Sequence, residues 1–249
     1  MKIIVIPDIH GQYTRLNDLF NKLKYNHDLN EYLIIFLGDY IDRGTENKKV
    51  IEYLVKLNTE YKCEFLLGNH DNLLLESINN YNHECFLDWI NNNGLTTASE
   101  YLGEKQASLT LYSIPDGGLW DSYSKTYNVK LFSHKFKKVF PIEHLNFFNN
   151  LKLYYETDKY FFVHAGVNLD KPINENTKDD FIWIRPPFFI NDKPKYPLNK
   201  LIIHGHTPVK FLENSTINIG IDFKAFDKNR MLIAYSPETH SILEFSDII

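Results

Sequence analysis

Five short, continuous apolar runs constrain the fold more than any other feature of the sequence. They are rich in β-branched and aromatic residues and span residues 2–6, 32–37, 64–67, 160–163 and 201–204. Because apolar and polar residues do not alternate, each run is typical of a strand buried on both faces. Apolar residues at helical spacing separate the first three runs, and Thr45 is the expected N-cap of the second helix. The chain is therefore predicted to begin as β-α-β-α-β with parallel strands.

The rest of the chain is predicted to add helices and then short strands to this core. Residues 72–102 have a helical pattern interrupted by NNNG, whereas residues 104–141 lack a strong period and contain PDGG. We interpret 104–141 as an excursion from the core. Three apolar pieces near the end, STINI, RMLIAYS and SILEF, predict short strands in a meander. With 249 residues, the chain fits one large α/β domain, residues 1–249.

Metal-competent polar residues follow nearly every apolar run. Because the carboxyl ends of parallel strands meet at one edge of a sheet, we expect these residues to converge there. A buried carboxylate such as Asp39 loses its hydration at a cost, so a metal or a cationic partner should replace the water. Asp8 and Asp39 are 31 positions apart and Asp39 and Asn69 are 30 apart, near the roughly 30 residues of one β-α-β unit. The residues that follow the runs are Asp8, His10, Asp39, Asp42, Arg43, Asn69, His70, Asp71, His164, His204 and His206.

Composition and charge argue against several classes of partner. The chain has 27 basic and 32 acidic residues, a formal charge of −5, which gives no general attraction to nucleic acid or anionic lipid. The first apolar run is too short for a signal peptide, and nothing approaches the roughly 18 consecutive apolar residues of a membrane span. Cys63 and Cys85 match neither a disulfide framework nor a metal-ligand spacing. We therefore expect a cytoplasmic monomer without a membrane or nucleic-acid partner.

Five motifs, DIHG, GDYIDRG, GNHD, HAG and HGHT, resemble in order and spacing those of the PPP-type serine/threonine phosphoprotein phosphatases within the calcineurin-like metallophosphoesterases. The segments WINNNGLTTASEYLG, HLNFFNNLKLYYET and WIRPPFF are similar to the bacterial and phage branch of that family. The resemblance covers most of the chain, through HGHT. It implies a four-layer α/β/β/α sandwich with a di-metal site at the edge between two sheets.

The same resemblance implies a set of ligands for two divalent metal ions. Asp39 would bridge both ions, and His204 would lie near the site without binding. The stretch IGIDFKAF (219–226) resembles the family's closing segment only loosely, so none of its residues is assigned. Mixed nitrogen and oxygen ligands suit manganese, iron and zinc alike, and manganese is our working expectation. The implied ligands are Asp8, His10 and Asp39 for the first ion, and Asp39, Asn69, His164 and His206 for the second.

The remaining motif residues resemble the catalytic and substrate-binding groups of the family. His70 resembles the general acid and Asp42 the carboxylate that orients it. Arg43 and Arg185, together with Asn69, resemble the groups that bind the phosphate. Physical chemistry supports these roles, because an imidazole held by a carboxylate can protonate a leaving alkoxide at neutral pH. Arginine also matches phosphate oxygens as a planar, bidentate donor.

These residues predict a di-metal phosphatase that hydrolyses phosphomonoesters. Two metal ions can convert a bridging water into hydroxide for in-line attack, with His70 protonating the leaving group. The expected substrate is phosphoserine or phosphothreonine on proteins, or another small phosphoester. A dinucleoside polyphosphate hydrolase of the diadenosine tetraphosphate type is the alternative, although the carboxylate at Asp42 favours the protein phosphatases. A non-catalytic scaffold with this fold is a further alternative, which the complete set of motif residues disfavours.

Overall fold

The first of two β-sheets is built by the start and the end of the chain. The computed structural model describes residues 2–80, 83–112, 122–185, 195–196, 198–212 and 216–247, with side chains in helices α6 and α7 described up to 108 and from 129. The strand order is β3-β2-β1-β8-β9. Strands β1, β2 and β3 are parallel, as predicted, and β8 and β9 are antiparallel neighbours. The strands are β1 (Lys2–Ile6), β2 (Tyr32–Phe36), β3 (Cys63–Phe65), β8 (Ile233–Ser236) and β9 (Ser241–Phe245).

The second sheet has the strand order β4-β5-β6-β7. Strands β5, β6 and β7 are parallel, and β4 pairs antiparallel with β5. The predicted meander at the end of the chain is therefore wrong for its first strand. Strand β7 joins β6 in this sheet, where Ile219 is buried between the sheets, whereas β8 and β9 return to the first sheet as a hairpin. The strands are β4 (Tyr154–Glu156), β5 (Tyr160–Val163), β6 (Leu201–His204) and β7 (Asn218–Gly220).

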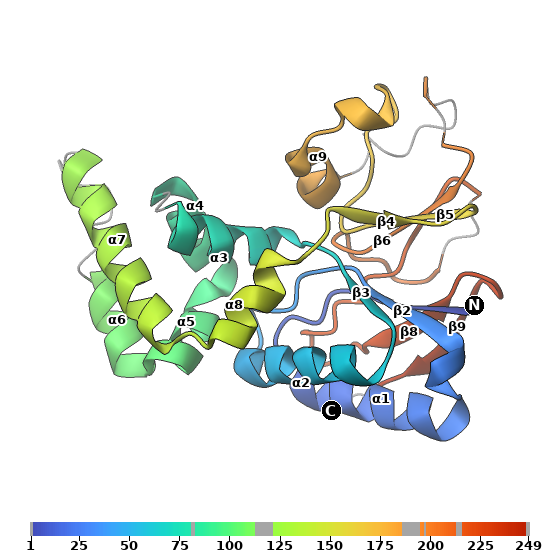
Figure 1. Cartoon of the computed structure of the whole chain (residues 1–249), viewed down its shortest axis with the longest axis horizontal. Helices are drawn as coiled ribbons and strands as arrows, with labels where there is room; N and C mark the ends of the chain where they lie inside the picture. Colours follow the sequence, from blue (N-terminus) through green and yellow to red (C-terminus); the bar gives the residue numbers. More distant parts are fainter. Residues whose placement is uncertain are drawn as a thin grey trace.

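The two sheets face each other and carry helices on their outer sides, which confirms the four-layer α/β/β/α sandwich (Figure 1). Strand β1 shows how the sequence produces the layers, because its side chains alternate between two cores. Ile4 and Ile6 pack against the helical side of the sheet, and Ile3 and Val5 pack toward the second sheet. The outer helices are α1 (Tyr13–Asn26) and α2 (Asn47–Glu60) on the first sheet, and α9 (Lys178–Trp183), after the 3-10 turn Ile173–Glu175, on the second.

Helix α2 is capped by a residue far away in the sequence rather than by Thr45. Its N-cap residue, Glu46, makes no side-chain capping bond. The carboxylate of Glu100 instead accepts the N–H groups of Asn47 and Lys48, each at 2.8 Å. An acidic group at a helix N-terminus is favourable for the exposed N–H groups and the helix dipole. This contact ties α2 to the helical segment that follows the third strand.

A helical layer lies beside the sheets, away from their outer faces (Figure 1). The described part of the predicted helical region 72–102 is helical, with a π-helical kink at Ile90–Gly94 that coincides with NNNG. The described part of 104–141 is also largely helical, and Phe132 and Phe136 of α7, together with Phe140 directly after this helix, are buried in the core cluster; PDGG lies outside the described residues. None of the described helices combines the length and apolar character needed to cross a membrane. The helices are α3 (Asn69–Asn79), α4 (His83–Trp89), α5 (Leu95–Leu102), α6 (Glu104–Tyr112), α7 (Ser122–Val139) and α8 (Ile142–Asn149).

Candidate functional site

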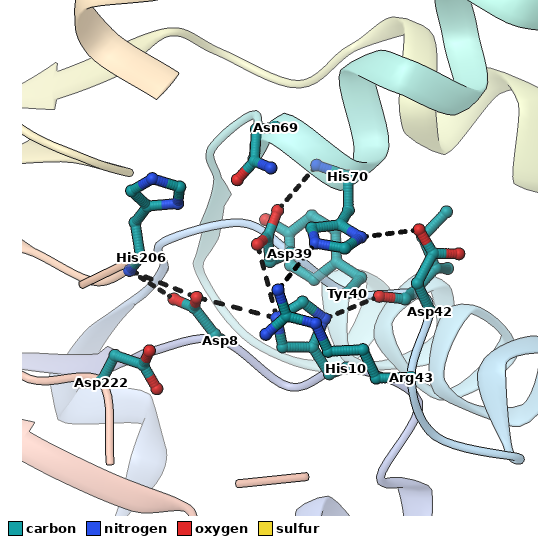
Figure 2. A network of polar contacts seen from close by, with 12 residues as sticks. Asp8, His10, Asp39, Tyr40, Asp42, Arg43, Asn69, His70, His206 and Asp222 are labelled. Carbon is teal, nitrogen blue, oxygen red and sulfur yellow. Dashed lines mark hydrogen bonds and ion pairs between the residues drawn. The ribbon is translucent and has the colours of Figure 1, made fainter. Parts of the chain in front are cut away.

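The predicted site residues converge where strands of both sheets end (Figure 2). The loops after β1, β2 and β6 deliver most of them, and Asn69 and His70 open helix α3. Several of these residues have backbone angles in the left-handed region, which is uncommon for residues with a Cβ and is found mostly in tight, functional turns. They are His10 (φ 49°), Asp39 (φ 51°), Asp42 (φ 72°), Arg43 (φ 67°) and His206 (φ 59°).

Asp39 lies at the centre of the buried cluster. Its Oδ2 lies 3.4 Å from Nε2 of His10 and 3.5 Å from Nε2 of His164. Its Oδ1 accepts the backbone N–H of His70 at 3.0 Å. Candidate ligand atoms of His10, Asp39 and His70 lie within 4.8 Å of one another, as do those of Asp39, His164 and His206. Asp39 is therefore shared by two neighbouring groups of metal-competent side chains.

The imidazoles are oriented by backbone carbonyls. Nδ1 of His10 donates to the carbonyl of Ile41, and Nδ1 of His164 donates to that of Leu37, both at 2.9 Å. A carbonyl only accepts, so the Nε2 of each ring carries a lone pair, which it directs toward Asp39. Such an outer hydrogen bond is the usual way in which a protein orients a metal-binding histidine.

Two further contacts fit a cation at this place. Oδ1 of Asn69 lies 3.0 Å from Nε2 of His164, so two acceptor atoms face each other, which a cation bound by both would relieve. Nε2 of His206 is buried and has no hydrogen-bond partner among the described residues. A buried imidazole nitrogen without a partner is costly unless a ligand or ion satisfies it. The cluster therefore fits bound divalent metal.

Asp8 is held beside the cluster by the loop after β6. Its Oδ1 and Oδ2 accept the backbone N–H of His206 at 3.1 and 3.2 Å, and its Oδ2 lies 3.9 Å from Nε2 of His10. A Cβ on Gly205 would come within 2.2 Å of Oδ1 of Asp8, so this close approach needs glycine. Asp8 thus lies next to the group that contains His10, as predicted.

Asp222 is a buried carboxylate near Asp8 that the sequence analysis left unassigned (Figure 2). Burial raises the pKa of Asp222 to about 6. Burial, followed by the charges of Asp222 and Asp39, raises the pKa of Asp8 well above its usual range. Three buried carboxylates repel one another unless cations compensate them. Asp222 follows β7 in the chain, so the strand-end rule that found the other carboxylates could have found it.

The electrostatics of the cluster favour ionised Asp39 and neutral imidazoles. Burial alone would raise the pKa of Asp39, but the positive charges that the four surrounding imidazoles carry when protonated hold it below its usual value. Burial lowers the pKa of His10 and His164, and lowers that of His206 to about 2. A carboxylate and neutral imidazoles are the forms that bind metal.

His70 and Asp42 form the predicted buried pair. Nδ1 of His70 lies 2.8 Å from Oδ2 of Asp42, and both side chains are almost fully buried. Nη2 of Arg43 lies 3.1 Å from Nε2 of His70. Because a guanidinium only donates, Nε2 of His70 is the acceptor in this arrangement. Nδ1 therefore carries the hydrogen and donates it in a hydrogen bond to Asp42. The imidazole therefore connects the carboxylate on one side with the cleft on the other.

A cleft of about 550 Å³ opens beside the cluster and contains both predicted arginines. The guanidinium carbon of Arg43 lies 4.5 Å from the centre of the Phe226 ring, a cation–π contact that supports it from below. Nη1 of Arg185 lies 3.4 Å from the carbonyl oxygen of His206. Residues 186–189 of the WIRPPFF motif lie outside the described residues. The lining residues are Arg43, Asn93, Arg185, His206, Pro208, Lys224 and Phe226.

Other residues near the site carry interactions that sequence reasoning did not identify. The carboxylate of Asp71 accepts the N–H groups of Gly68, Asp39 and Tyr40, which shapes the turn that presents Asp39. His204 is buried, and burial lowers its pKa to about 4. Of the groups of candidate ligands found among the described residues, His204 belongs to neither.

Comparisons with known proteins agree with this geometry. The Metallophos family model, described as calcineurin-like phosphoesterase, matches residues 1–231. Serine/threonine-protein phosphatase PP1-1 of Saccharomyces cerevisiae is 34% identical over 118 residues, which are 46% of this chain and 36% of that protein. The match with this curated relative therefore spans about a third of its length.

Two other relatives align with nearly the whole chain. Bis(5'-nucleosyl)-tetraphosphatase PrpE of Oceanobacillus iheyensis is 29% identical over 258 residues, covering 96% of this chain and 90% of that protein. A crystal structure of a proposed diadenosine tetraphosphatase has a TM-score of 0.57 at 15% identity, covering 98% of this chain and 92% of that one, which shows a shared fold. With the family model matching nearly its full length, the chain belongs to the calcineurin-like phosphoesterase family.

Proposed function

We propose that this chain is a di-metal phosphatase that hydrolyses phosphomonoesters, with phosphoserine and phosphothreonine of proteins as its substrates. One observation carries the proposal: Asp39 is shared by two buried groups of metal-competent side chains, and His70, which belongs to the first group, is paired with the buried carboxylate of Asp42. Membership of the phosphoesterase family supports the reaction class.

Two divalent ions are the implied cofactors, with manganese as our working choice and iron or zinc as the alternatives. The buried carboxylates support cations here, as does Nε2 of His206, which has no hydrogen-bond partner in the described part of the chain. When bound, such ions supply a strong oxygen nucleophile at neutral pH and neutralise charge on the phosphoryl group. The proposed ligands are Asp8, His10 and Asp39 for one ion, and Asp39, Asn69, His164 and His206 for the other.

His70 is the proposed general acid. Its Nδ1–H is held by Asp42, which fixes the tautomer and the orientation of the ring. Arg43 now donates to Nε2. If Arg43 turns to bind phosphate oxygens, Nε2 becomes free to carry the proton that the leaving oxygen needs. The same movement would thus bind substrate and expose the acid.

The cleft supports an anionic substrate. Arg43 and Arg185 would hold the non-bridging phosphate oxygens, where planar guanidinium groups suit the charge that builds up during transfer. Lys224 adds a third cationic side chain to the same cleft. The net charge of the whole chain is −5, so any attraction for the substrate is local.

Hydrolysis of dinucleoside polyphosphates is the second candidate. The relative that aligns with nearly the whole chain, PrpE of Oceanobacillus iheyensis, is named a bis(5'-nucleosyl)-tetraphosphatase. The buried Asp42 carboxylate on His70 supports the first candidate, because an alkoxide leaving group needs a proton whereas a nucleotide phosphate leaves more readily without one.

The test is phosphatase activity of chelator-stripped protein with and without added Mn²⁺. We expect Mn²⁺ to restore hydrolysis of p-nitrophenyl phosphate by the wild type and by Asp158→Asn, an exposed control, but not by Asp39→Asn. Comparing a phosphoserine peptide with diadenosine tetraphosphate then separates the two candidates. Preference for the nucleotide would replace the first candidate by the second, and folded protein inactive with every divalent metal would refute both.

A further inference from the structure

The carboxylate of Asp42 is held by more than His70. Nε1 of Trp89 donates to both carboxylate oxygens, at 3.1 and 3.0 Å, and the hydroxyl of Thr97 donates to Oδ1 at 2.6 Å. Asp42, Trp89 and Thr97 are all fully buried. Trp89 ends helix α4 and Thr97 lies in α5, so both donors come from the helical layer rather than from the sheets.

The backbone of Asp42 is fixed from the same side. Its N–H is shared between Oδ1 of Asn47 at 2.7 Å and Oγ1 of Thr97 at 3.1 Å. Thr97 therefore contacts both the side chain and the backbone of Asp42. Its hydroxyl donates to Oδ1, whereas Nδ1 of His70 donates to Oδ2. A buried carboxylate is costly without donors, and donors on both oxygens determine which way it faces.

We propose that Trp89 and Thr97 are positioning residues for proton transfer: they hold Asp42 so that its Oδ2 orients the imidazole of His70 toward the leaving oxygen. The inference rests on the proposed phosphatase function. Neither residue contacts the phosphate or the leaving group in this role. They act through Asp42, and their loss should therefore matter most when the leaving group needs a proton.

The kink between α4 and α5 is built around the Trp89 indole. A Cβ on Gly94 would lie 2.5 Å from Nε1 of Trp89, the atom that donates to Asp42. Gly94 itself has helical angles, φ −61° and ψ −17°, so alanine suits its backbone and the indole is what forbids it. This glycine is therefore required by the side chain that holds Asp42, and not by the backbone.

Helix α7 also packs against the same indole. The Trp89 ring meets Phe132 and Phe136 edge to face, with centroids 5.9 and 6.2 Å away. These contacts fix the ring in one orientation. The segment interpreted as an excursion from the core thus helps to position a residue that acts on Asp42.

The experiment compares two substrates that differ in their need for an acid: a phosphoserine peptide and p-nitrophenyl phosphate. Thr97→Val keeps the shape of the side chain and removes the hydroxyl, Thr97→Ser keeps the hydroxyl, and Gly94→Ala displaces the indole. Because general acid catalysis contributes about 10²–10⁴-fold, we expect Thr97→Val and Gly94→Ala to lower kcat on the peptide by about 10-fold or more. The loss on p-nitrophenyl phosphate should be within about 3-fold, since that leaving group departs without a proton.

Thr97→Ser should restore most of the peptide activity lost in Thr97→Val, with KM and metal content unchanged. Thr59→Val is the control, because it makes the same substitution at an exposed position of α2, where the hydroxyl donates to the carbonyl of Lys56. Equal losses on both substrates in Thr97→Val, or the same split in Thr59→Val, would overturn the proposal. A wild type that hydrolyses neither substrate would instead contradict the proposed function.

A second measurement does not depend on turnover. The His70 Nδ1–H that Asp42 accepts should give a downfield proton NMR signal in the wild type and in Thr97→Ser. We expect this signal to shift or disappear in Thr97→Val and Gly94→Ala. An unchanged signal in both variants would show that Asp42 holds His70 without these residues, whatever the enzyme hydrolyses.

Discussion

Arg15 holds in place the loop that brings Lys224 and Phe226 to the cleft, so replacing it tests how that loop is stabilised. This residue of α1 is 4% exposed, and its guanidinium donates to backbone carbonyls of a loop between β7 and β8. The same loop brings Lys224 and Phe226 to the cleft, where Phe226 supports Arg43. Replacing Arg15 by methionine keeps an extended side chain and removes all of these donors. The accepting carbonyls belong to Ala225, Asp227, Lys228 and Arg230.

The expected loss of stability is moderate rather than large. A hydrogen bond to a charged group contributes about 1.5–3 kcal/mol, but burying the guanidinium costs free energy that offsets part of the sum. Lys228 and Asn229 are exposed, so carbonyls in this part of the loop can reach water after the change. We therefore expect Arg15→Met to lower the free energy of unfolding by about 2–3 kcal/mol. At roughly 2–4 °C per kcal/mol for a chain of this size, Tm falls by about 4–12 °C.

Thermal unfolding and steady-state kinetics check this expectation together. Lys24→Met is the matched control, because Lys24 lies on the same helix and makes a partly exposed ion pair with Glu60 at 3.7 Å; such pairs contribute about 0–1 kcal/mol. We also expect Arg15→Met to raise KM for p-nitrophenyl phosphate, because Arg43 loses the ring beneath it. A fall in Tm no larger than that of Lys24→Met, with KM unchanged, would refute the reasoning.

Three further changes test the metal cluster and the acid. His70→Asn should lower kcat strongly for alkyl phosphates and less for p-nitrophenyl phosphate; equal losses would remove His70 from the acid's role. Gly205→Ala should reduce metal content in elemental analysis, because its Cβ would lie 2.2 Å from Oδ1 of Asp8. Burial lowers the pKa of His204 from 6.5 to about 4, so the unfolded state binds its proton more readily and stability falls as the pH drops between these values. Urea unfolding at pH 5 and pH 7 should therefore show a smaller pH dependence of the free energy of unfolding for His204→Gln than for the wild type. An equal pH dependence in both proteins would contradict this role of His204.

The sequence predicts most of the fold because the strands are continuous apolar runs. The parallel order of β1, β2 and β3 follows from the helical spacing between the runs. Strand β7 was placed wrongly because the loop after it is not a tight hairpin turn: Arg15 holds that loop against α1. No local pattern shows that contact, since it joins positions more than 200 residues apart.

Side chains at strand ends were predictable for the same topological reason, and the structure brings Asp8, Asp39, His164 and His206 together. Their partners were not predictable. Glu100 caps α2 in place of Thr45, and Trp89 and Thr97 donate to Asp42 across 47 and 55 positions. These contacts depend on how the helical layer packs against the sheets, which no periodicity in the sequence specifies.

Backbone strain explains why the cluster needs so many buried acceptors. A residue with a Cβ in the left-handed region costs about 1–2 kcal/mol, and Asp39, Asp42 and His206 all adopt it. Each has its backbone N–H bonded to a buried side chain: that of Asp39 to Asp71, that of Asp42 to Asn47, and that of His206 to Asp8. Such bonds contribute about 0.5–1.5 kcal/mol each, and about 1.5–3 kcal/mol when the acceptor is charged, which is comparable to the strain. Asp8 therefore has two roles, since the carboxylate proposed to bind metal also holds the turn that presents His206. Removing it should disturb the ligands of both ions, although it is a proposed ligand of only one.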